Sequence, residues 1–108
     1  MSFKSSFSKI IHKMPKRDYG IPGLHVYVDH TAQATIYYVE TEQELTFPEH
    51  KHAEQFTIVV NGFCELTIDG KSTRYEKGDS YSIPADTLHT IYLSAGYAEI
   101  DCVDDPND

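Results

Sequence analysis

Short apolar segments alternate with turn residues along most of the chain. From residue 24 onward, segments rich in valine, isoleucine, threonine and tyrosine recur at close intervals, bounded by pairs such as Asn61-Gly62 and Asp69-Gly70. This composition is typical of strands, and Asp-Gly is a strong hairpin signal. Many short strands at regular spacing favour a β-sandwich or β-barrel. The predicted strands cover residues 24–28, 34–39, 45–50, 56–60, 64–68, 71–75, 80–83, 89–93 and 98–103.

Residues 1–18 have a different pattern. Their few apolar side chains recur at a rough helical spacing, which predicts a short N-terminal helix or an arm laid on the body or on a partner. Pro15 limits any helix there. Residues 19–108 are expected to form a single β-barrel domain without internal repeats. The apolar residues of the arm are Phe3, Phe7, Ile10, Ile11 and Met14.

Length and charge narrow the possible classes of protein. A chain of 108 residues is long enough for one domain with one hydrophobic core. The formal net charge of -8 argues against a nucleic-acid partner, because phosphate contacts require clustered lysine and arginine. No apolar run is long enough to cross a membrane, and the first residues lack the apolar segment of a signal peptide, so we expect a cytoplasmic location. Cys64 and Cys102 are then expected to be reduced thiols.

Three histidines carry the main chemical signal. His50 and His52 are two residues apart, a spacing that places both side chains on one face of a strand, and His89 follows on a later strand. Imidazoles are common ligands of zinc, nickel, iron and copper, and three protein ligands leave an open position of the kind used in catalysis. We therefore expect a divalent metal ion, whether zinc, nickel, iron, manganese or copper.

Around these histidines the sequence resembles the two motifs of the cupin family, small double-sheet jelly rolls. The resemblance implies an all-β double-stranded β-helix, or jelly-roll barrel, with His50, His52, Gln55 and His89 as metal ligands. Two positions depart from the motifs: the leading glycine of the first is absent, and Asp86 replaces a glycine, which aspartate tolerates where the backbone is left-handed. The matching residues are His50, His52, Gln55 and Gly62, then Gly78, Pro84 and His89.

The fourth ligand has two candidates. Strict strand alternation would place Glu54, not Gln55, on the face of His50 and His52. A turn or bulge after His52 would reset the facing and favour Gln55, which lies at the family's distance from Gly62. A neutral amide leaves the metal charge uncompensated and favours anionic substrates or Lewis-acid chemistry.

Asp101 on the last predicted strand is a candidate catalytic residue. The set of His, His, Gln and His in a small single domain resembles cupins that open the ring of unsaturated uronic acids, and those place an aspartate on the final strand near the metal. They also use an aromatic residue and an arginine shortly afterwards, whereas here Val103 replaces the aromatic and no arginine follows. Asp101 could instead face solvent. Tyr37 and Tyr81 are further candidates as hydrogen-bond donors at the barrel mouth.

Two classes of function follow. As a metal-dependent enzyme of isomerase, lyase, ring-opening or cyclase type, the protein would act on a small oxygen-rich molecule such as a sugar acid, and Asp101 or a tyrosine would move the proton. With iron the same site would suit a dioxygenase. The alternative is a non-catalytic binding or sensor module for a small molecule. The resemblance also implies a homodimer, with Phe56, Ile58, Val60, Phe3 and Phe7 as candidate contacts.

Overall fold

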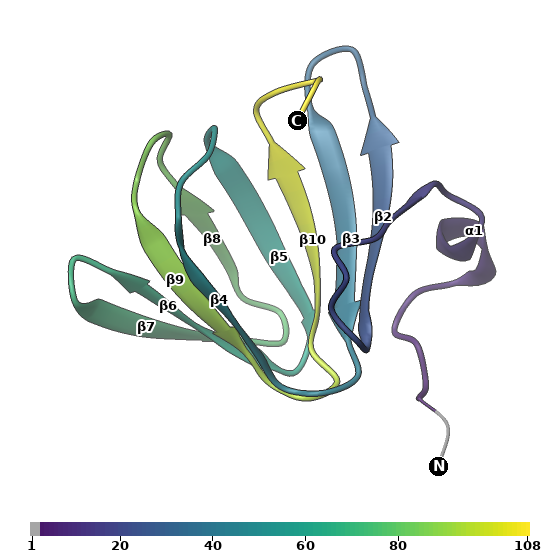
Figure 1. Cartoon of the computed structure of the whole chain (residues 1–108), viewed down its shortest axis with the longest axis horizontal. Coiled ribbons are helices and arrows are strands. Elements are labelled where there is room, and N and C mark those ends of the chain that lie inside the picture. The colour runs from purple at the N-terminus through teal and green to yellow at the C-terminus, as the bar shows by residue number, and fades with distance from the viewer. Residues whose placement is uncertain (1–2) are drawn as a thin grey trace.

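The computed structural model, which describes residues 3–108, consists of two antiparallel sheets that face each other (Figure 1). Every strand predicted from the sequence is present, with ends that differ by at most two residues. The strands are β1 (Lys16–Arg17), β2 (Leu24–His30), β3 (Thr35–Thr41), β4 (Leu45–His50), β5 (Gln55–Asn61), β6 (Phe63–Ile68), β7 (Lys71–Glu76), β8 (Ser80–Ile83), β9 (His89–Leu93) and β10 (Ala98–Val103).

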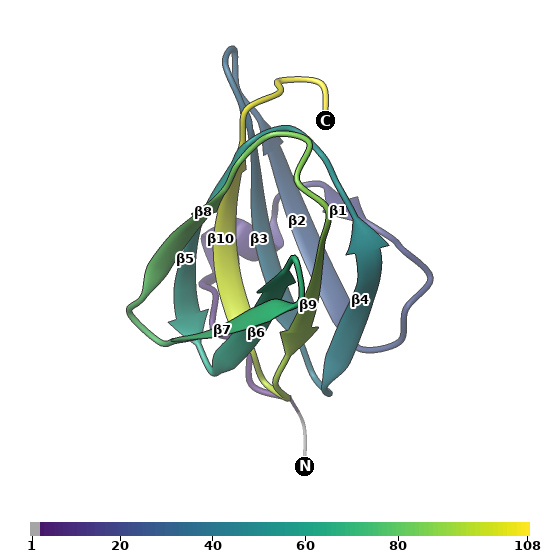
Figure 2. The same ribbon diagram turned by 90° about the vertical axis from the view of Figure 1, so that its left-hand side faces the viewer.

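Successive strands change sheets repeatedly. One sheet has the order β1-β2-β3-β10-β5-β8 and the other β4-β9-β6-β7. The chain therefore crosses between sheets at every connection from β3 to β10 except the β6–β7 hairpin. This connectivity confirms the predicted jelly roll. The β4–β5 and β8–β9 loops arch over the same end of the barrel, where the end of the chain also lies (Figure 2).

The barrel interior is filled by the inward-facing residues of both sheets. Strand β5 alternates buried and exposed positions, so that Thr57 and Val59 point inward while Phe56 and Ile58 face outward with 44% exposure each. Cys64 is fully buried in the larger core cluster and Cys102 is half-buried on the outer face of β10; both are free thiols. Burial raises the pKa of Cys64 to about 11, which keeps its thiol protonated and unreactive.

The N-terminal segment contains both a short helix and an arm. Helix α1 covers Lys9–His12, and within residues 3–108 no helix is long and apolar enough to span a membrane. The Phe7 ring packs edge-on against Tyr38, with centroids 5.7 Å apart, and Phe3 stacks on His25. Of the three phenylalanines expected at a dimer contact, the two in the arm, Phe3 and Phe7, therefore pack on their own chain.

The arm is fastened to the sheet by a buried carboxylate. Glu40 is 1% exposed, and it accepts hydrogen bonds from the Ser5 hydroxyl at 2.5 Å and the Ser6 amide at 2.9 Å. After α1 the chain forms β1, which was not predicted and which pairs Arg17 with Val26 at the edge of the larger sheet. A strand of only two residues is too short to show an alternating pattern from which it could be predicted.

Three turn positions, Asp86, Gly62 and Gly70, adopt left-handed backbone. Asp86, which replaces a motif glycine, has a φ of 57°, so the expected left-handed conformation is confirmed. Gly62 has a φ of 71°, and a Cβ atom there would lie 2.6 Å from Ser94 Oγ and 3.1 Å from Tyr97 Cα. At Gly70, with a φ of 73°, nothing lies within 4 Å of such an atom.

This contrast makes a matched pair of variants. We predict that Gly70→Ala lowers the free energy of unfolding by about 1–2 kcal/mol, the cost of left-handed backbone alone. Gly62→Ala should cost about 2–5 kcal/mol, because the added methyl group also collides with buried neighbours. Urea denaturation of both variants beside the wild type measures the difference. Equal losses would show that the close approach at Gly62 is not constraining.

Candidate metal centre

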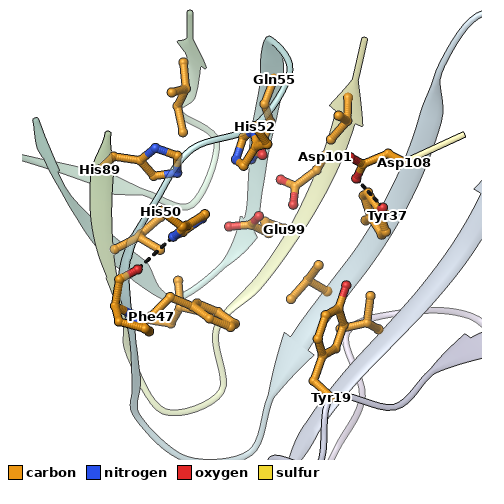
Figure 3. Close-up of a pocket in the computed structure, with 17 residues that line it drawn as sticks. Tyr19, Tyr37, Phe47, His50, His52, Gln55, His89, Glu99, Asp101 and Asp108 are labelled. Atoms are coloured by element: carbon orange, nitrogen blue, oxygen red, sulfur yellow. Dashed lines mark hydrogen bonds between the residues drawn. The ribbon is translucent and has the colours of Figure 1, made fainter. Parts of the chain in front are cut away.

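Three histidines converge at one end of the barrel interior (Figure 3). His50 ends β4 and pairs directly with His89, which begins β9, and their ring centroids are 4.2 Å apart. His52 lies in the loop after β4, with its ring 5.4 Å from that of His50 and 5.0 Å from that of His89. One ring nitrogen of each histidine lies within 4.8 Å of the others, an arrangement that could hold a metal ion.

The route by which His50 and His52 meet differs from the sequence prediction. Strand β4 ends at His50, and its pairing with β9 is irregular between Phe47 and His50. The two side chains therefore do not share a strand face. The chain turns after His50, and the His52 side chain enters the same cavity from the loop that follows β4. Alternation predicts facing only within an uninterrupted strand.

Backbone carbonyls orient all three imidazoles. The Nδ1 atom of His50 lies 2.8 Å from the Pro48 oxygen, that of His52 lies 2.7 Å from the Ala53 oxygen, and that of His89 lies 2.8 Å from the Thr87 oxygen. A carbonyl oxygen only accepts, so each Nδ1 carries the proton and each Nε2 presents a lone pair. This hydrogen bonding is typical of metal-ligating histidines. Burial lowers the pKa of His89, which favours the neutral, ligating form. The donor set thus fits a divalent transition metal.

Gln55 and Glu54 occupy different environments. Gln55 begins β5, is 9% exposed and lines the same cavity as the histidines, whereas Glu54 is exposed. The Gln55 Nε2 donates to Thr57 Oγ1 at 2.8 Å. This bond commits the amide nitrogen to Thr57 and leaves the carbonyl oxygen as the end of Gln55 suited to a metal.

Two acidic side chains line the cavity from β10. Asp101 and Glu99 are 7% and 5% exposed, so Asp101 does not face solvent. The hydroxyl of Thr57 donates to Asp101 Oδ1 at 2.7 Å, and that of Tyr97 donates to Glu99 Oε1 at 2.6 Å. Burial, followed by the charge of Glu99, raises the pKa of Asp101 well above its ordinary value.

Sequence reasoning missed Glu99, although a signal was present. Glu99 and Asp101 are two residues apart on one strand, so whichever face holds Asp101 also holds Glu99. Buried carboxyl pairs are costly unless they are hydrogen-bonded or protonated. Their presence beside three histidines is therefore informative about function.

The two tyrosines proposed as donors have different positions. Tyr37 pairs across the strands with Asp101 and lines the cavity, and its hydroxyl donates to Asp108 Oδ2 at 2.5 Å. Tyr81 is absent from the cavity lining; it is buried in the core and stacks on Tyr75 with centroids 4.5 Å apart. Tyr81 pairs with Thr57, which lies two residues further into the barrel along β5 than the pair of Gln55 and Ile83. This depth explains why Tyr81 does not reach the mouth of the cavity.

Together these residues enclose a cavity of about 410 Å³. This volume suits a small molecule, and polar groups on a largely apolar lining are typical of ligand-binding sites. Its polar and aromatic lining residues are Tyr19, Tyr37, Phe47, His50, His52, Gln55, His89, Glu99, Asp101 and Asp108.

The jelly-roll fold and the histidine cluster inside one end place this chain among small β-barrels with an internal ligand cavity. Residues 35–103 match the family model described as "Cupin domain". The chain therefore belongs to the cupin family, as its motifs indicated. A comparison with curated protein sequences finds no match.

Solved structures share the fold. KdgF from Halomonas sp. is 24% identical with a TM-score of 0.72, over 84% of this chain and 86% of that one. An RmlC-like cupin from Shewanella frigidimarina is 22% identical with a TM-score of 0.72, over 94% and 90% of the two chains. A single-residue variant of oxalate decarboxylase from Bacillus subtilis is 15% identical with a TM-score of 0.76, but the match covers 91% of this chain and only 29% of that one. At these identities the likeness concerns the fold alone.

The buried carboxyl at position 101 should make stability depend on pH. A carboxyl whose pKa is raised by folding contributes stability at low pH and loses it as the pH rises from its unfolded value, about 3.9, through its folded value. We predict that Asp101→Asn, which cannot ionise, becomes more stable relative to wild type between pH 4 and pH 8. The gain should grow steadily as the pH rises, because only the wild type carries a buried carboxyl that ionises in this range.

Urea denaturation of chelator-treated protein at both pH values measures this gain. The exposed Asp104→Asn is the matched control, and it should follow the wild type. An Asp101→Asn variant that also follows the wild type would contradict the prediction.

Proposed function

We propose that this cupin is a metal-dependent enzyme of isomerase, lyase or ring-opening type that acts on a small sugar acid. The observation that carries the proposal is the meeting, in one cavity, of three histidines with free Nε2 atoms and the buried carboxyl of Asp101. His50, His52, His89 and Gln55 would hold the metal. When bound, it supplies Lewis-acid polarisation of a carbonyl or hydroxyl oxygen.

Asp101 has the properties of the proton-transferring group. Burial raises its pKa above that of an ordinary aspartate, which makes the Asp101 carboxylate a stronger base, and a positioned carboxyl can both give and take a proton. Thr57 holds one carboxyl oxygen at 2.7 Å, and the other remains for substrate or for Glu99. Tyr97 fixes Glu99 in turn, so the two carboxyls keep their positions during the reaction.

The choice of sugar acid rests on ligand pattern and charge. The pattern of three histidines and a glutamine, with an aspartate on the last strand, resembles the uronate ring-opening cupins. A neutral glutamine in the ligand set leaves the full metal charge to attract an anionic or oxygen-rich substrate.

We also propose that two copies associate through the outer face of the larger sheet. Phe56 and Ile58 are each 44% exposed there, and Ile100 pairs with Ile58 across the strands. The arm covers Tyr38 on the same face but leaves β5 open. An apolar sheet surface of this kind is stabilised when a second copy buries it.

Metal content is the first test. Protein purified without a tag and reconstituted separately with zinc, nickel, iron, manganese or copper should hold close to one ion per chain. The His50→Ala/His89→Ala double variant should lose it, and His25→Ala, on the outer side, should not. Gln55→Ala should weaken metal binding at least about 10-fold, since losing even a group that only orients a ligand costs about 10- to 100-fold. Metal titration with elemental analysis measures both effects.

Glu54→Ala is the control for Gln55→Ala and should bind metal as the wild type does. The reverse result would assign the fourth ligand to Glu54. Absence of metal from the reconstituted wild type would overturn the enzyme proposal and favour a binding module. Iron as the retained metal would direct the search to oxygen chemistry.

Proton transfer is the second test. In D2O, the metal-loaded protein should incorporate deuterium next to the carbonyl of its sugar-acid substrate, or ring-open an unsaturated uronate, as followed by proton NMR. We predict that Asp101→Asn slows this step about 10²- to 10⁴-fold, the usual contribution of a general acid–base, while metal content stays unchanged. Glu65→Gln, an exposed change, should leave the rate unaltered. Turnover that is indifferent to Asp101 would assign proton transfer elsewhere.

A further inference from the structure

An arginine from an unexpected part of the chain lies directly behind the cavity lining: Arg17 is not itself a lining residue, but it contacts Tyr37 and Asp108, which are. No arginine follows Asp101 in the sequence, yet Arg17 on β1 pairs with Val26, whose side chain lines the cavity. The Arg17 Nη1 donates to the Tyr37 hydroxyl at 2.8 Å, and its guanidinium carbon lies 5.2 Å from the centre of the Tyr37 ring. Only small valines separate Arg17 from Tyr37 on the intervening strand, which leaves room for this approach.

The side chains of Arg17 and Tyr37 both donate hydrogen bonds to Asp108. Tyr37 donates to the side-chain carboxylate of Asp108 at 2.5 Å, and Arg17 Nη2 donates to the main-chain oxygen of Asp108 at 3.0 Å. Asp108 lines the cavity that holds the three histidines (Figure 3). A carboxylate is therefore accommodated at this end of the cavity, although Asp101 lies on the neighbouring strand.

Arg17 forms no ion pair with a side-chain carboxylate in the described part of the chain. Within residues 3–108 the close contacts between basic and acidic side chains are His12–Glu40, His25–Glu42 and Arg74–Glu76. The Arg17 guanidinium donates instead to the Tyr37 hydroxyl and to the main-chain oxygen of Asp108. A guanidinium so placed, with donors fixed in a planar fork, is suited to a carboxylate.

We propose that Arg17 and Tyr37 form the carboxylate-binding end of the substrate cavity and that Asp108 holds this place as an internal competitor. The inference rests on the proposed function and narrows its substrate class to acids whose carboxylate points away from the metal. The substrate extends from the histidines past Asp101 to Arg17, and its carboxylate replaces that of Asp108.

Residues 104–108 are suited to being displaced. The segment is held to the barrel by isolated hydrogen bonds, including Thr35 to the Asp105 oxygen at 2.6 Å and His30 to the Pro106 oxygen at 3.0 Å. Asp108 itself is exposed and packs in no core cluster. Competition of this kind lowers the apparent affinity for substrate by the fraction of time the site is covered.

The test compares two sugars that differ only in the carboxylate. Binding of D-galacturonate and D-galactose is measured by titration calorimetry on zinc-loaded protein and on chelator-treated protein. We expect both forms of the wild type to prefer galacturonate. Arg17→Met should weaken galacturonate binding about 10- to 100-fold and leave galactose within about threefold, because it removes charge-assisted hydrogen bonds. Asp108→Ala should tighten galacturonate binding about 3- to 10-fold.

Lys16→Met is the matched control. Lys16 is next to Arg17 on β1 but contacts His25 on the outer face, so its loss removes the same charge without touching the cavity. Unchanged galacturonate binding in Arg17→Met, or a wild type that binds both sugars equally, would overturn the proposal and leave Arg17 as a fastener of the chain end. Asp108→Ala tests the competitor independently should Arg17→Met fail to fold. Chelator-treated protein that keeps the preference would support the clamp even if no turnover were found.

Discussion

The antiparallel pairing of β4 with β9 is the contact on which the site depends. It sets His50 opposite His89, and so joins two motifs that lie on either side of the β5–β8 segment. The register is irregular between Phe47 and His50, which frees the end of β4 to turn into the loop that carries His52. Because the carbonyls that orient the imidazoles belong to the same strand ends and loops, the pairing fixes the positions and the tautomers together.

The fold could be read from the sequence because each strand has its own periodicity and turn residues. The same reading predicted that His50, His52 and His89 lie together, as they do, and allowed left-handed backbone at Asp86. It could not place Tyr81, since alternation says which residues face inward but not how deep they lie along the barrel axis. Nor could it find β1, whose pairing with β2 depends on the path of the arm across the sheet. The contact of Arg17 with Tyr37 depends on that path, and no local sequence pattern predicts it.

The acidic lining is an energetic cost that the fold meets with hydrogen bonds. The side chains of Gln55, Thr57 and Asp101 form a hydrogen-bonded chain across β5 and β10. The hydroxyl of Tyr97 donates a hydrogen bond to Glu99. Burial with these few partners raises the proton affinity of Asp101, which is unfavourable for stability near neutral pH. A protein that needed only a stable barrel would place apolar residues on this face, as it does at Val103.

The order of strands in the larger sheet limits the length of a molecule that the cavity can hold. Gln55, Asp101 and Tyr37 lie on the neighbouring strands β5, β10 and β3, each about 4.8 Å from the next. The distance from the metal side to the carboxylate side is therefore about two strand spacings, roughly 10 Å between backbones and less between the inward-pointing side chains. Asp101 lies midway, where it can reach a carbon between the two ends. This spacing and the volume of about 410 Å³ are consistent with the single sugar acid that we propose as substrate and are too small for an oligosaccharide held wholly inside the barrel.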